Sequence, residues 1–296
     1  MSIRRATLQD IVVRCDRLAQ QGQRLRPGQP PLAALDADGT LWAPDVAALL
    51  WQRLVREQAL DRRAGPPLAR ALRECGVEPR RDPHADYEQL DRLHRSGLMK
   101  EETMVRAMLQ GLAGLREEAV YQHSTAVVAE TPELRQLGEG ELRAMIDQLR
   151  NLGFRVVVVS GSPRWTVEVA VAPLGIEARD IVAGQVAVVG GVLTDGILEP
   201  LPWGKGKVQA ILRRFGTVPR ISMGNGLGDL PMLEATSDLR VLVNPSDDLM
   251  LACEEIRGAT WTMGLLGLPA EKPSKAAVAR VGGTSSVRRS RPTAST

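Results

Sequence analysis

The chain has 296 residues, and its 38 lysine and arginine residues against 35 aspartate and glutamate residues give a formal net charge of +3. Hydrophobic residues make up 44% of the sequence and charged residues 25%, which is typical of a soluble globular protein of about two domains. The small basic excess disfavours a nucleic-acid binder, because such proteins usually carry more positive charge on their folded part.

The cysteines and the apolar runs indicate the compartment. Three cysteines lie far apart, at positions 15, 75 and 253, without the spacing of a disulfide framework or a zinc site. The apolar runs are shorter than the roughly 18 residues that a membrane span requires. The N-terminal residues lack the apolar stretch of a secretory signal. We therefore expect a cytoplasmic protein without membrane contact.

The first elements in chain order are a helix and a buried strand. Residues 1–21 have apolar positions at helical spacing, and a loop rich in glycine, proline and glutamine follows. The apolar run 32–35 then ends at Asp36 and a glycine-containing turn. Such a run predicts a short buried strand.

A block of helices follows this strand. Apolar residues recur every three to four positions over 46–60, 85–95, 100–113 and 115–129, which predicts helices. Gly65-Pro66-Pro67 is expected to break the pattern, as are two later stretches that contain glycine. No strand is predicted in this block.

After Pro132 helices and strands alternate. Helices are predicted over 139–151, 163–174, 205–215 and 229–235. Strands are predicted over 154–159, 181–182, 220–223, 240–243 and 260–263, with a hairpin formed by 186–189 and 192–197. This alternation predicts an α/β fold, a Rossmann-like doubly wound parallel sheet with helices on both faces.

The pattern divides the chain into four parts. Residues 1–29 are expected to form an N-terminal helical extension, and 30–45 with 131–268 the α/β core. Residues 46–130 would be an all-helical block inserted into that core. Residues 269–296 are rich in serine, threonine, arginine and proline, and this composition predicts a disordered tail.

Two carboxylates, Asp36 and Asp38, directly follow the first predicted strand. Paired carboxylates at a strand end can bind a hard cation, act as a nucleophile and shuttle a proton. An ordinary Asp-Gly turn is the alternative interpretation, and it accounts for most isolated pairs of this kind.

Other polar residues at strand ends and helix starts favour a catalytic site at Asp36 and Asp38 over an ordinary turn. Ser160 ends the most strand-like run, and Asp229 closes a glycine-rich loop after another strand. Lys205 and Lys207 are two of only five lysines and open a predicted helix. A nucleophile, a metal and donors directed at phosphoryl oxygens are what phosphoryl transfer requires.

These residues, in this order, resemble the haloacid dehalogenase-like superfamily of phosphohydrolases. The resemblance rests on DxDGT at 36–40, a strand ending in Ser160, a lysine, and GNGxxD at 224–229. The helical block is similar to the small cap of the phosphoserine phosphatase branch. Gly204-Lys205-Gly206-Lys207-Val208 resembles the third motif of that branch, in which the catalytic lysine matches Lys205, with Lys207 as the alternative.

The resemblance implies a role for each residue. Asp36 would attack phosphorus and form an aspartyl-phosphate, and Asp38 would act as general acid and base. Ser160 and Lys205 would hold the phosphoryl oxygens, with Thr40 supporting the first loop. The remaining implied contacts are a Mg²⁺ site at Asp36, Asp38, Asn225 and Asp229 and a substrate contact at Gly161.

The sequence departs from the family pattern at two positions. Asn225 stands where the branch has an aspartate that ligates Mg²⁺ directly, so weaker Mg²⁺ binding is expected. Either Asn225 or Asp229 could be the direct ligand. Asp45, nine residues after Asp36, stands where the branch has a glutamate that contacts the substrate ammonium group, which makes phosphoserine itself a less certain substrate.

Weaker signals concern the substrate. Trp42, Trp165 and Trp203 lie close in sequence to the motifs, and aromatic faces near acidic residues would suit a quaternary ammonium group. Packing in the core is the alternative for these side chains. Arg106, on a cap helix, could contact a substrate carboxylate, although an arginine-rich helix face is usually only solvated.

The function expected from the sequence is Mg²⁺-dependent hydrolysis of a small phosphomonoester, with a phosphoserine-, phosphocholine- or phosphoethanolamine-like substrate. A non-catalytic or catalytically weak binding protein with the same fold is one alternative, supported by Asn225 alone. A phosphotransferase that uses another alcohol as acceptor is the other.

Overall fold

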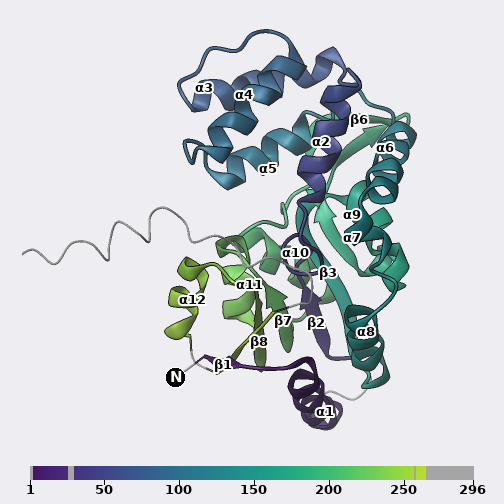
Figure 1. The fold of residues 1–296 in the computed structure, drawn as a ribbon, viewed down its shortest axis with the longest axis vertical. Helices are drawn as coiled ribbons and strands as arrows, with labels where there is room; N and C mark the ends of the chain where they lie inside the picture. The colour runs from purple at the N-terminus through teal and green to yellow at the C-terminus, as the bar shows by residue number, and fades with distance from the viewer. Residues whose placement is uncertain (1–2, 26–29, 257, 265–296) are drawn as a thin grey trace, which may run out of the picture.

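A computed structural model describes residues 3–25, 30–256 and 258–264, and the predicted tail 269–296 lies outside them. Seven parallel strands form one sheet in the order β1-β9-β8-β7-β2-β3-β4 (Figure 1). The strands are β1 (Arg4–Arg5), β2 (Leu32–Leu35), β3 (Arg155–Pro163), β4 (Ile181–Gly184), β7 (Ile221–Gly224), β8 (Leu239–Val243) and β9 (Ala259–Met263). The predicted parallel α/β sheet is confirmed.

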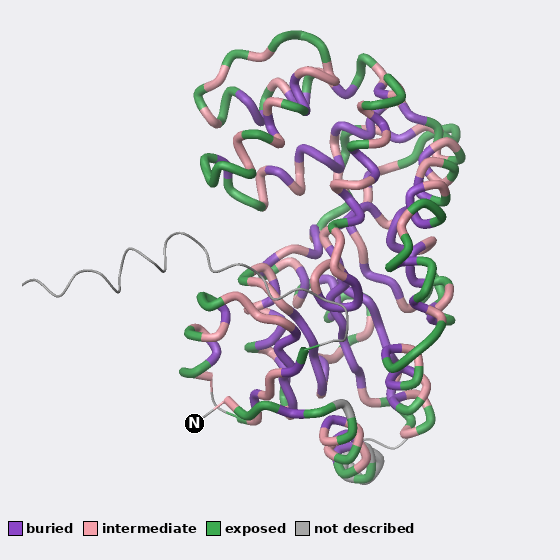
Figure 2. The backbone as a smooth tube through the Cα atoms, in the orientation of Figure 1, coloured by how far each residue is buried: buried purple, intermediate pink, exposed green. Residues whose placement is uncertain are grey.

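Helices cover both faces of the sheet, because alternate residues of each central strand point to opposite sides. In β2, Ala33 and Leu35 pack in one hydrophobic cluster, and Leu32 and Ala34 pack in another. The first cluster includes residues of α1 (Leu8–Leu25), α8 (Glu141–Asn151) and α9 (Arg164–Val171), and the second includes residues of α10 (Lys205–Phe215) and α11 (Leu230–Ala235). Figure 2 shows the strands as the buried centre of this layer.

The helical insertion has a hydrophobic core of its own. It contains α2 (Val46–Arg56), α3 (Gly65–Glu74), α4 (Pro83–Arg95), α5 (Glu101–Gln110) and α6 (Glu117–Glu130). Leu50, Trp51, Leu72 and Leu109 are among the buried residues of this second core. Figure 1 shows α3, α4 and α5 in a lobe beyond the ends of the strands.

The last helix of the insertion also packs on the α/β core. The hydroxyls of Ser124 in α6 and Thr166 in α9 lie 2.9 Å apart in a buried contact. Val120 belongs to the hydrophobic core of the insertion, whereas Val128, near the other end of α6, belongs to the core of the sheet. Helix α6 therefore connects the two hydrophobic cores.

The expected break at Gly65-Pro66-Pro67 is wrong, because α3 begins there. The two prolines occupy the first turn of the helix. A proline without an N–H group is tolerated in the first turn, since the N–H groups there have no partner within the helix. The pattern of glycine and proline thus marks the start of a helix and not an interruption.

A hairpin completes the hydrophobic core of the insertion. The antiparallel strands β5 (Val186–Val189) and β6 (Val192–Ile197) match the predicted hairpin. The backbone N–H of Gly114 donates to the carbonyl of Leu193 at 2.8 Å, and that of Leu193 donates to the carbonyl of Leu115 at 2.9 Å. The hairpin therefore pairs with the loop between α5 and α6, a contact that the local pattern did not indicate.

Other elements also differ from the sequence prediction. Arg4 and Arg5 form β1, which pairs with β9 at the edge of the sheet, so that the N-terminal segment is not helical throughout. Short helices α7 (Pro132–Arg135) and α12 (Asp247–Glu254) were not predicted. Within the described ranges, none of the helices combines the length and the hydropathy that crossing a bilayer demands.

Candidate active site

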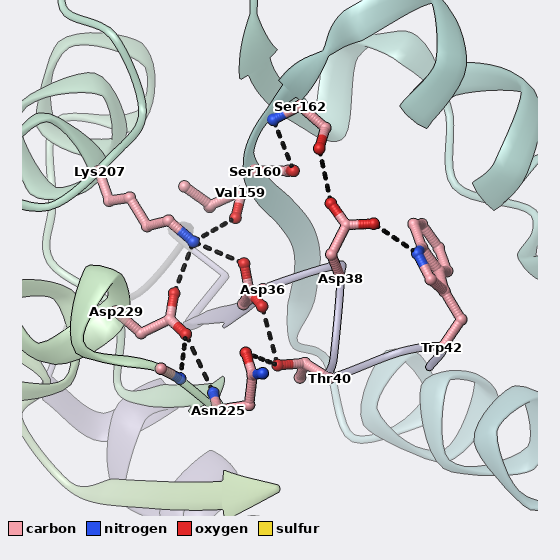
Figure 3. A network of polar contacts seen from close by, with 11 residues as sticks. Asp36, Asp38, Thr40, Trp42, Val159, Ser160, Ser162, Lys207, Asn225 and Asp229 are labelled. Atoms are coloured by element: carbon pink, nitrogen blue, oxygen red, sulfur yellow. Dashed lines mark hydrogen bonds and ion pairs between the residues drawn. The ribbon is translucent and has the colours of Figure 1, made fainter. Parts of the chain in front are cut away.

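The carboxyl ends of three central strands bring the predicted motifs together. Strand β2 pairs with β3 on one side and with β7 on the other. Asp36 follows β2, Ser160 lies in the last part of β3, and Asn225 follows β7. Crevices at the carboxyl ends of strands, where the strand order reverses, are the usual ligand sites of such sheets. Figure 3 shows the resulting network of polar contacts.

A buried lysine connects two of the motifs. The Lys207 ammonium donates to Asp36 Oδ1 and to Asp229 Oδ1, both at 2.6 Å, and to the carbonyl of Val159 at 3.0 Å (Figure 3). Only 3% of Lys207 is exposed. All three donor positions of the ammonium are therefore used inside the protein.

The preference for Lys205 over Lys207 is wrong in this structure. Both residues lie in the first turn of α10, but two positions along a helix correspond to a rotation of about 200°. Lys205 is consequently exposed, whereas Lys207 points to the sheet. Gly206 lets α10 begin there, since a Cβ atom at this position would lie 1.8 Å from the carbonyl oxygen of Leu201.

The buried trio of Asp36, Lys207 and Asp229 has one positive and two negative groups. Burial alone would lower the pKa of Lys207, but the charges of Asp229 and Asp36 raise it above its usual value, and the ammonium remains protonated. Burial and the charge of Asp229 raise the pKa of Asp36 to about 7, against the opposing effect of Lys207. With both carboxyl groups ionised, the trio therefore carries one more negative than positive charge.

Asp38 is held in a separate set of hydrogen bonds. Its Oδ1 accepts from the indole N–H of Trp42 at 2.7 Å and from the backbone N–H of Val46 at 3.0 Å. Its Oδ2 accepts from the hydroxyl of Ser162 at 2.6 Å. Figure 3 shows this carboxyl group turned away from Lys207. The two carboxylates of the first motif thus have different environments.

These environments influence the protonation of Asp38. Burial, followed by the charge of Asp45, raises the pKa of Asp38 to about 6, although hydrogen bonds from Ser162, Val46 and Trp42 oppose the rise. A carboxyl group with a pKa near the working pH can both release and accept a proton. The geometry therefore suits the predicted general acid and base.

Thr40 and Ser160 are positioned by neighbours in the same site. The Thr40 hydroxyl donates to Asp36 Oδ2 at 2.9 Å. The Ser160 hydroxyl oxygen accepts from the backbone N–H of Ser162 at 3.1 Å, which leaves its own proton free for a ligand. Gly161, the expected substrate contact, lies between these serines and lines the cavity.

The loop after β7 places an amide oxygen beside the first motif. Asn225 Oδ1 is 3.3 Å from the Thr40 hydroxyl, which also contacts Asp36. Gly39 has a φ of +76°, and a Cβ there would lie 2.0 Å from Asn225 Nδ2. Glycine at this position therefore permits both the turn and the close approach of Asn225.

The oxygens of Asp36 and Asn225 fit a Mg²⁺ ion that keeps several waters. Mg²⁺ is commonly held by one or two carboxylates together with waters and phosphate oxygens. Asp229 has less freedom, because Lys207 and the backbone N–H groups of Asn225 and Gly226 use both of its oxygens. Among the residues described, no three His, Cys, Asp or Glu side chains form a closed metal cage.

A cavity of about 520 Å³ joins these residues to the insertion. Asp36, Asp38, Ser160, Lys207 and Asp229 line it from the sheet side. Side chains of the insertion line the other part, and these are Asp45, Ala47, Ala48, Tyr87, Asp91, His94, Glu101, Met104, Val105 and Met108. Sequence reasoning selected only Asp45 from this second group.

Two predicted substrate contacts have different outcomes. Asp45 lines the cavity and also caps α2, accepting from the backbone N–H of Ala48 at 2.9 Å. Arg106 does not line the cavity, and its guanidinium pairs with Glu102 at 3.1 Å and with Glu199 at 2.7 Å. The prediction for Arg106 is wrong in this structure, because it faces the segment that follows the hairpin.

The three tryptophans do not form a cage. Trp42 and Trp165 are buried, and their indole N–H groups donate to Asp38 at 2.7 Å and to Glu117 at 2.9 Å. Trp203 lines the cavity. The packing alternative therefore holds for two of the three.

Ser162, Tyr87, Asp91 and Glu101 were missed as site residues. Ser162 lies next to the predicted Ser160 and Gly161, so that an argument from the strand end could have included it. The other three are on α4 and α5, and no local motif connects these helices to the strand ends.

Comparison with known proteins agrees with this geometry. The model of the haloacid dehalogenase-like hydrolase family matches residues 33–234. A phosphoserine phosphatase of Halobacterium salinarum is 30% identical over 195 residues, which cover 61% of this chain and 90% of the relative.

Two solved structures share the fold. A protein of unknown function from Bordetella pertussis Tohama I has a TM-score of 0.60 at 16% identity, covering 79% of this chain and 98% of its own. A functionally unknown protein from Anaerococcus prevotii has a TM-score of 0.58 at 15% identity, covering 88% and 93%. The family match includes the insertion and every motif from Asp36 to Asp229. The chain belongs to the haloacid dehalogenase-like hydrolase family.

Proposed function

We propose that this hydrolase is a Mg²⁺-dependent phosphatase that hydrolyses a small phosphorylated metabolite through an aspartyl-phosphate on Asp36. The observation that supports it most directly is the buried Lys207, which joins Asp36 and Asp229 at the inner end of a cavity. The name of the relative from Halobacterium salinarum, phosphoserine phosphatase, supports the same reaction class.

Asp36 is the nucleophile in this proposal. A carboxylate oxygen of Asp36 forms a bond to phosphorus while the bond from phosphorus to the alcohol oxygen breaks. Asp38 gives its proton to the departing alcohol oxygen. Asp38 then takes a proton from a water molecule, which attacks the aspartyl-phosphate, releases inorganic phosphate and restores Asp36.

Donors at the strand ends hold the transferred group. The free proton of the Ser160 hydroxyl is placed to contact a phosphoryl oxygen, and Gly161 lines the cavity beside it. The Lys207 ammonium, whose three N–H groups are used by Asp36, Asp229 and Val159, contributes its positive charge next to the nucleophile. Such fixed donors stabilise charge that develops on the equatorial oxygens in the transition state. Thr40 keeps Asp36 oriented during both steps.

Asp36, the backbone carbonyl of Asp38 and Asn225 would hold Mg²⁺. When bound, the ion neutralises negative charge on the phosphoryl group. Asp229 orients the loop and Lys207 and is not a direct ligand in this proposal, because its oxygens already accept three hydrogen bonds, from Lys207 and from the backbone N–H groups of Asn225 and Gly226. Those of Asp36 accept two. The substrate is a phosphomonoester of the phosphoserine, phosphocholine or phosphoethanolamine type.

Release of inorganic phosphate from p-nitrophenyl phosphate tests the proposal. We expect turnover with Mg²⁺, loss of turnover with excess EDTA, and recovery when Mg²⁺ is restored. Asp36→Asn should abolish turnover without unfolding the protein, because an amide is not a competent nucleophile and has lost the charge that attracts the ion. Near wild-type turnover in that variant would contradict the role of Asp36. A folded protein that releases no phosphate from any ester would instead favour the non-catalytic alternative.

A further inference from the structure

The insertion side of the cavity is lined by three carboxylates. Asp45, Asp91 and Glu101 come from the start of α2, from α4 and from the start of α5. Among the described residues that line the cavity, the side chains able to carry positive charge are Lys207, at the inner end, and His94. The outer part of the cavity therefore offers a ligand several negative charges and neither an arginine nor a lysine.

Two of these carboxylates lack a strong ion pair with a basic side chain. Asp91 contacts Arg95 at 2.9 Å, but the Arg95 side chain is 62% exposed, and such exposed pairs are weak. Glu101 is exposed and has no hydrogen bond or ion pair with another described residue. Burial raises the pKa of Asp45, and the charges of Glu101 and Asp91 oppose its ionisation further. The three groups thus share one region and repel one another.

Tyr87 provides a second and independent observation. It is only 4% exposed, yet it lines the cavity and stacks on Trp51 with 4.3 Å between ring centroids. Its hydroxyl has no hydrogen-bond partner in the described parts of the protein. The phenol group is therefore available to a ligand in the same region as the carboxylates.

On the basis of the proposed phosphatase function, we infer that the substrate is the phosphate ester of an amino alcohol whose leaving group has a protonated amine and no carboxylate. A protonated amine donates hydrogen bonds to open carboxylate oxygens and to a phenol oxygen. A substrate carboxylate would meet three negative charges, and among the described lining residues of the insertion it would find neither an arginine nor a lysine, with His94 as the one side chain able to carry positive charge. Met104 and Met108 line the same cavity and suit the methylene groups between amine and phosphate.

The same geometry distinguishes a primary amine from a quaternary one. A quaternary ammonium has no N–H group, so it leaves the oxygens of Glu101 and Tyr87 without a donor. Such a group is usually recognised by a cage of several aromatic faces. Of the three tryptophans only Trp203 lines the cavity, with Tyr87, because Trp42 and Trp165 are buried and bonded elsewhere. O-phosphoethanolamine is the simplest ester with the inferred chemistry.

The test compares kcat/KM for four esters at saturating Mg²⁺. These are O-phosphoethanolamine, 2-hydroxyethyl phosphate, in which a hydroxyl replaces the amine, phosphocholine and O-phosphoserine. We expect O-phosphoethanolamine to exceed each of the other three by about tenfold or more, the range of a hydrogen bond to a charged group. O-phosphoserine equal to or better than O-phosphoethanolamine would overturn the inference.

A pair of variants locates the preference. Glu101→Gln should reduce the ratio of kcat/KM for O-phosphoethanolamine over 2-hydroxyethyl phosphate by about tenfold. The matched control is Glu102→Gln, since Glu102 neighbours Glu101 in the chain but pairs with Arg106 and does not line the cavity. That control should leave the ratio within about twofold. An equal fall in both variants, or no fall in Glu101→Gln, would contradict recognition by Glu101.

Failure of the phosphatase function gives a different result from failure of this inference. If none of the esters, p-nitrophenyl phosphate included, releases phosphate, the proposed reaction is wrong, and the same ligands are compared by isothermal titration calorimetry. Tighter binding of O-phosphoethanolamine than of 2-hydroxyethyl phosphate and O-phosphoserine would still support an amine site. Equal binding would overturn it. Turnover of p-nitrophenyl phosphate without preference for the amine would contradict the inference alone.

Discussion

The hydroxyl of Ser162 donates to Oδ2 of Asp38 at 2.6 Å, although the two residues lie 124 positions apart in the chain. On the other side of the same carboxyl group, Trp42 and Val46 donate to Oδ1. These three donors fix the rotation of the carboxyl group. Ser162 is therefore a positioning residue for the proposed general acid.

Ser162→Ala should lower kcat/KM for an alkyl phosphate by about tenfold, the effect of losing one hydrogen bond to a charged group. p-Nitrophenyl phosphate should be affected much less, because its leaving group departs without a proton. The control is Ser124→Ala, which removes another buried hydroxyl, one that contacts Thr166 away from the cavity. Equal losses with both esters would contradict the positioning of a general acid.

Substitution by methionine should destabilise the protein strongly at one of the two lysines of α10 and hardly at all at the other. Lys207→Met leaves Asp36 and Asp229 buried without their cation, and breaking a buried ion pair in this way costs about 3–5 kcal/mol of unfolding free energy. Lys205→Met removes an exposed side chain and should change stability by less than about 0.5 kcal/mol. Urea denaturation and phosphate release measure both effects. Loss of turnover in Lys205→Met would restore Lys205 as the catalytic lysine.

Asp38→Asn should make the protein more stable at neutral pH, by up to about 3 kcal/mol. The amide fits the existing contacts, because its oxygen can accept from Trp42 and Val46 and its nitrogen can donate to the Ser162 hydroxyl oxygen. The substitution also removes the cost of ionising a buried carboxyl group.

The sign of the pH dependence follows from the pKa of Asp38. Folding raises it from 3.8 to about 6, so the folded chain binds this proton more tightly than the unfolded chain. Stability of the wild type relative to Asp38→Asn should therefore fall as pH rises from about 4 to about 6 and then stay constant. Thermal unfolding in EDTA at several pH values measures this difference. A constant difference across the range would contradict the raised pKa.

The sequence predicted which side chains lie together where a motif coincides with a strand end. Asp36, Thr40 and Ser160 take their places from β2 and β3, and local pattern identifies those strands because they are short, buried apolar runs. The choice between Lys205 and Lys207 depended on the face of α10 that meets the sheet. That face is set by tertiary packing, which a motif does not contain.

The residues that the insertion contributes to the site could not be predicted from the sequence, because their positions also depend on tertiary packing. Its helices were mostly predicted, but Tyr87 and Glu101 come together only through the packing of α4 and α5. The pairing of the hairpin with Leu115 and the addition of β1 to the sheet are also long-range contacts. Local periodicity predicts elements, and it has no information on which elements become neighbours.

Asn225 supplies an amide oxygen to the proposed Mg²⁺ site. Asn225 Oδ1 and Asp36 Oδ2 are both hydrogen-bonding neighbours of the Thr40 hydroxyl, so that Asn225→Asp would place a second anionic oxygen beside Asp36. A hard divalent cation gains more from an anionic oxygen than from an amide oxygen. The concentration of Mg²⁺ at half-maximal turnover should therefore fall by about tenfold. Without Mg²⁺ the variant should unfold at a lower temperature than the wild type, because two buried carboxylates then repel each other.

Asp229→Asn separates the two candidate ligands. It keeps oxygen and nitrogen atoms near Lys207 and the loop but removes the charge that pairs with the ammonium. If Asp229 only orients Lys207, this variant should have a lower but measurable turnover, while its half-saturating Mg²⁺ concentration changes by less than about threefold. Titration of phosphate release against Mg²⁺, together with thermal unfolding with and without Mg²⁺, measures both variants. An unchanged half-saturating concentration in Asn225→Asp, combined with loss of Mg²⁺-dependent stabilisation in Asp229→Asn, would assign the direct ligand to Asp229. The reason is that an ion that binds the folded state stabilises it, and stabilises it more the tighter it binds.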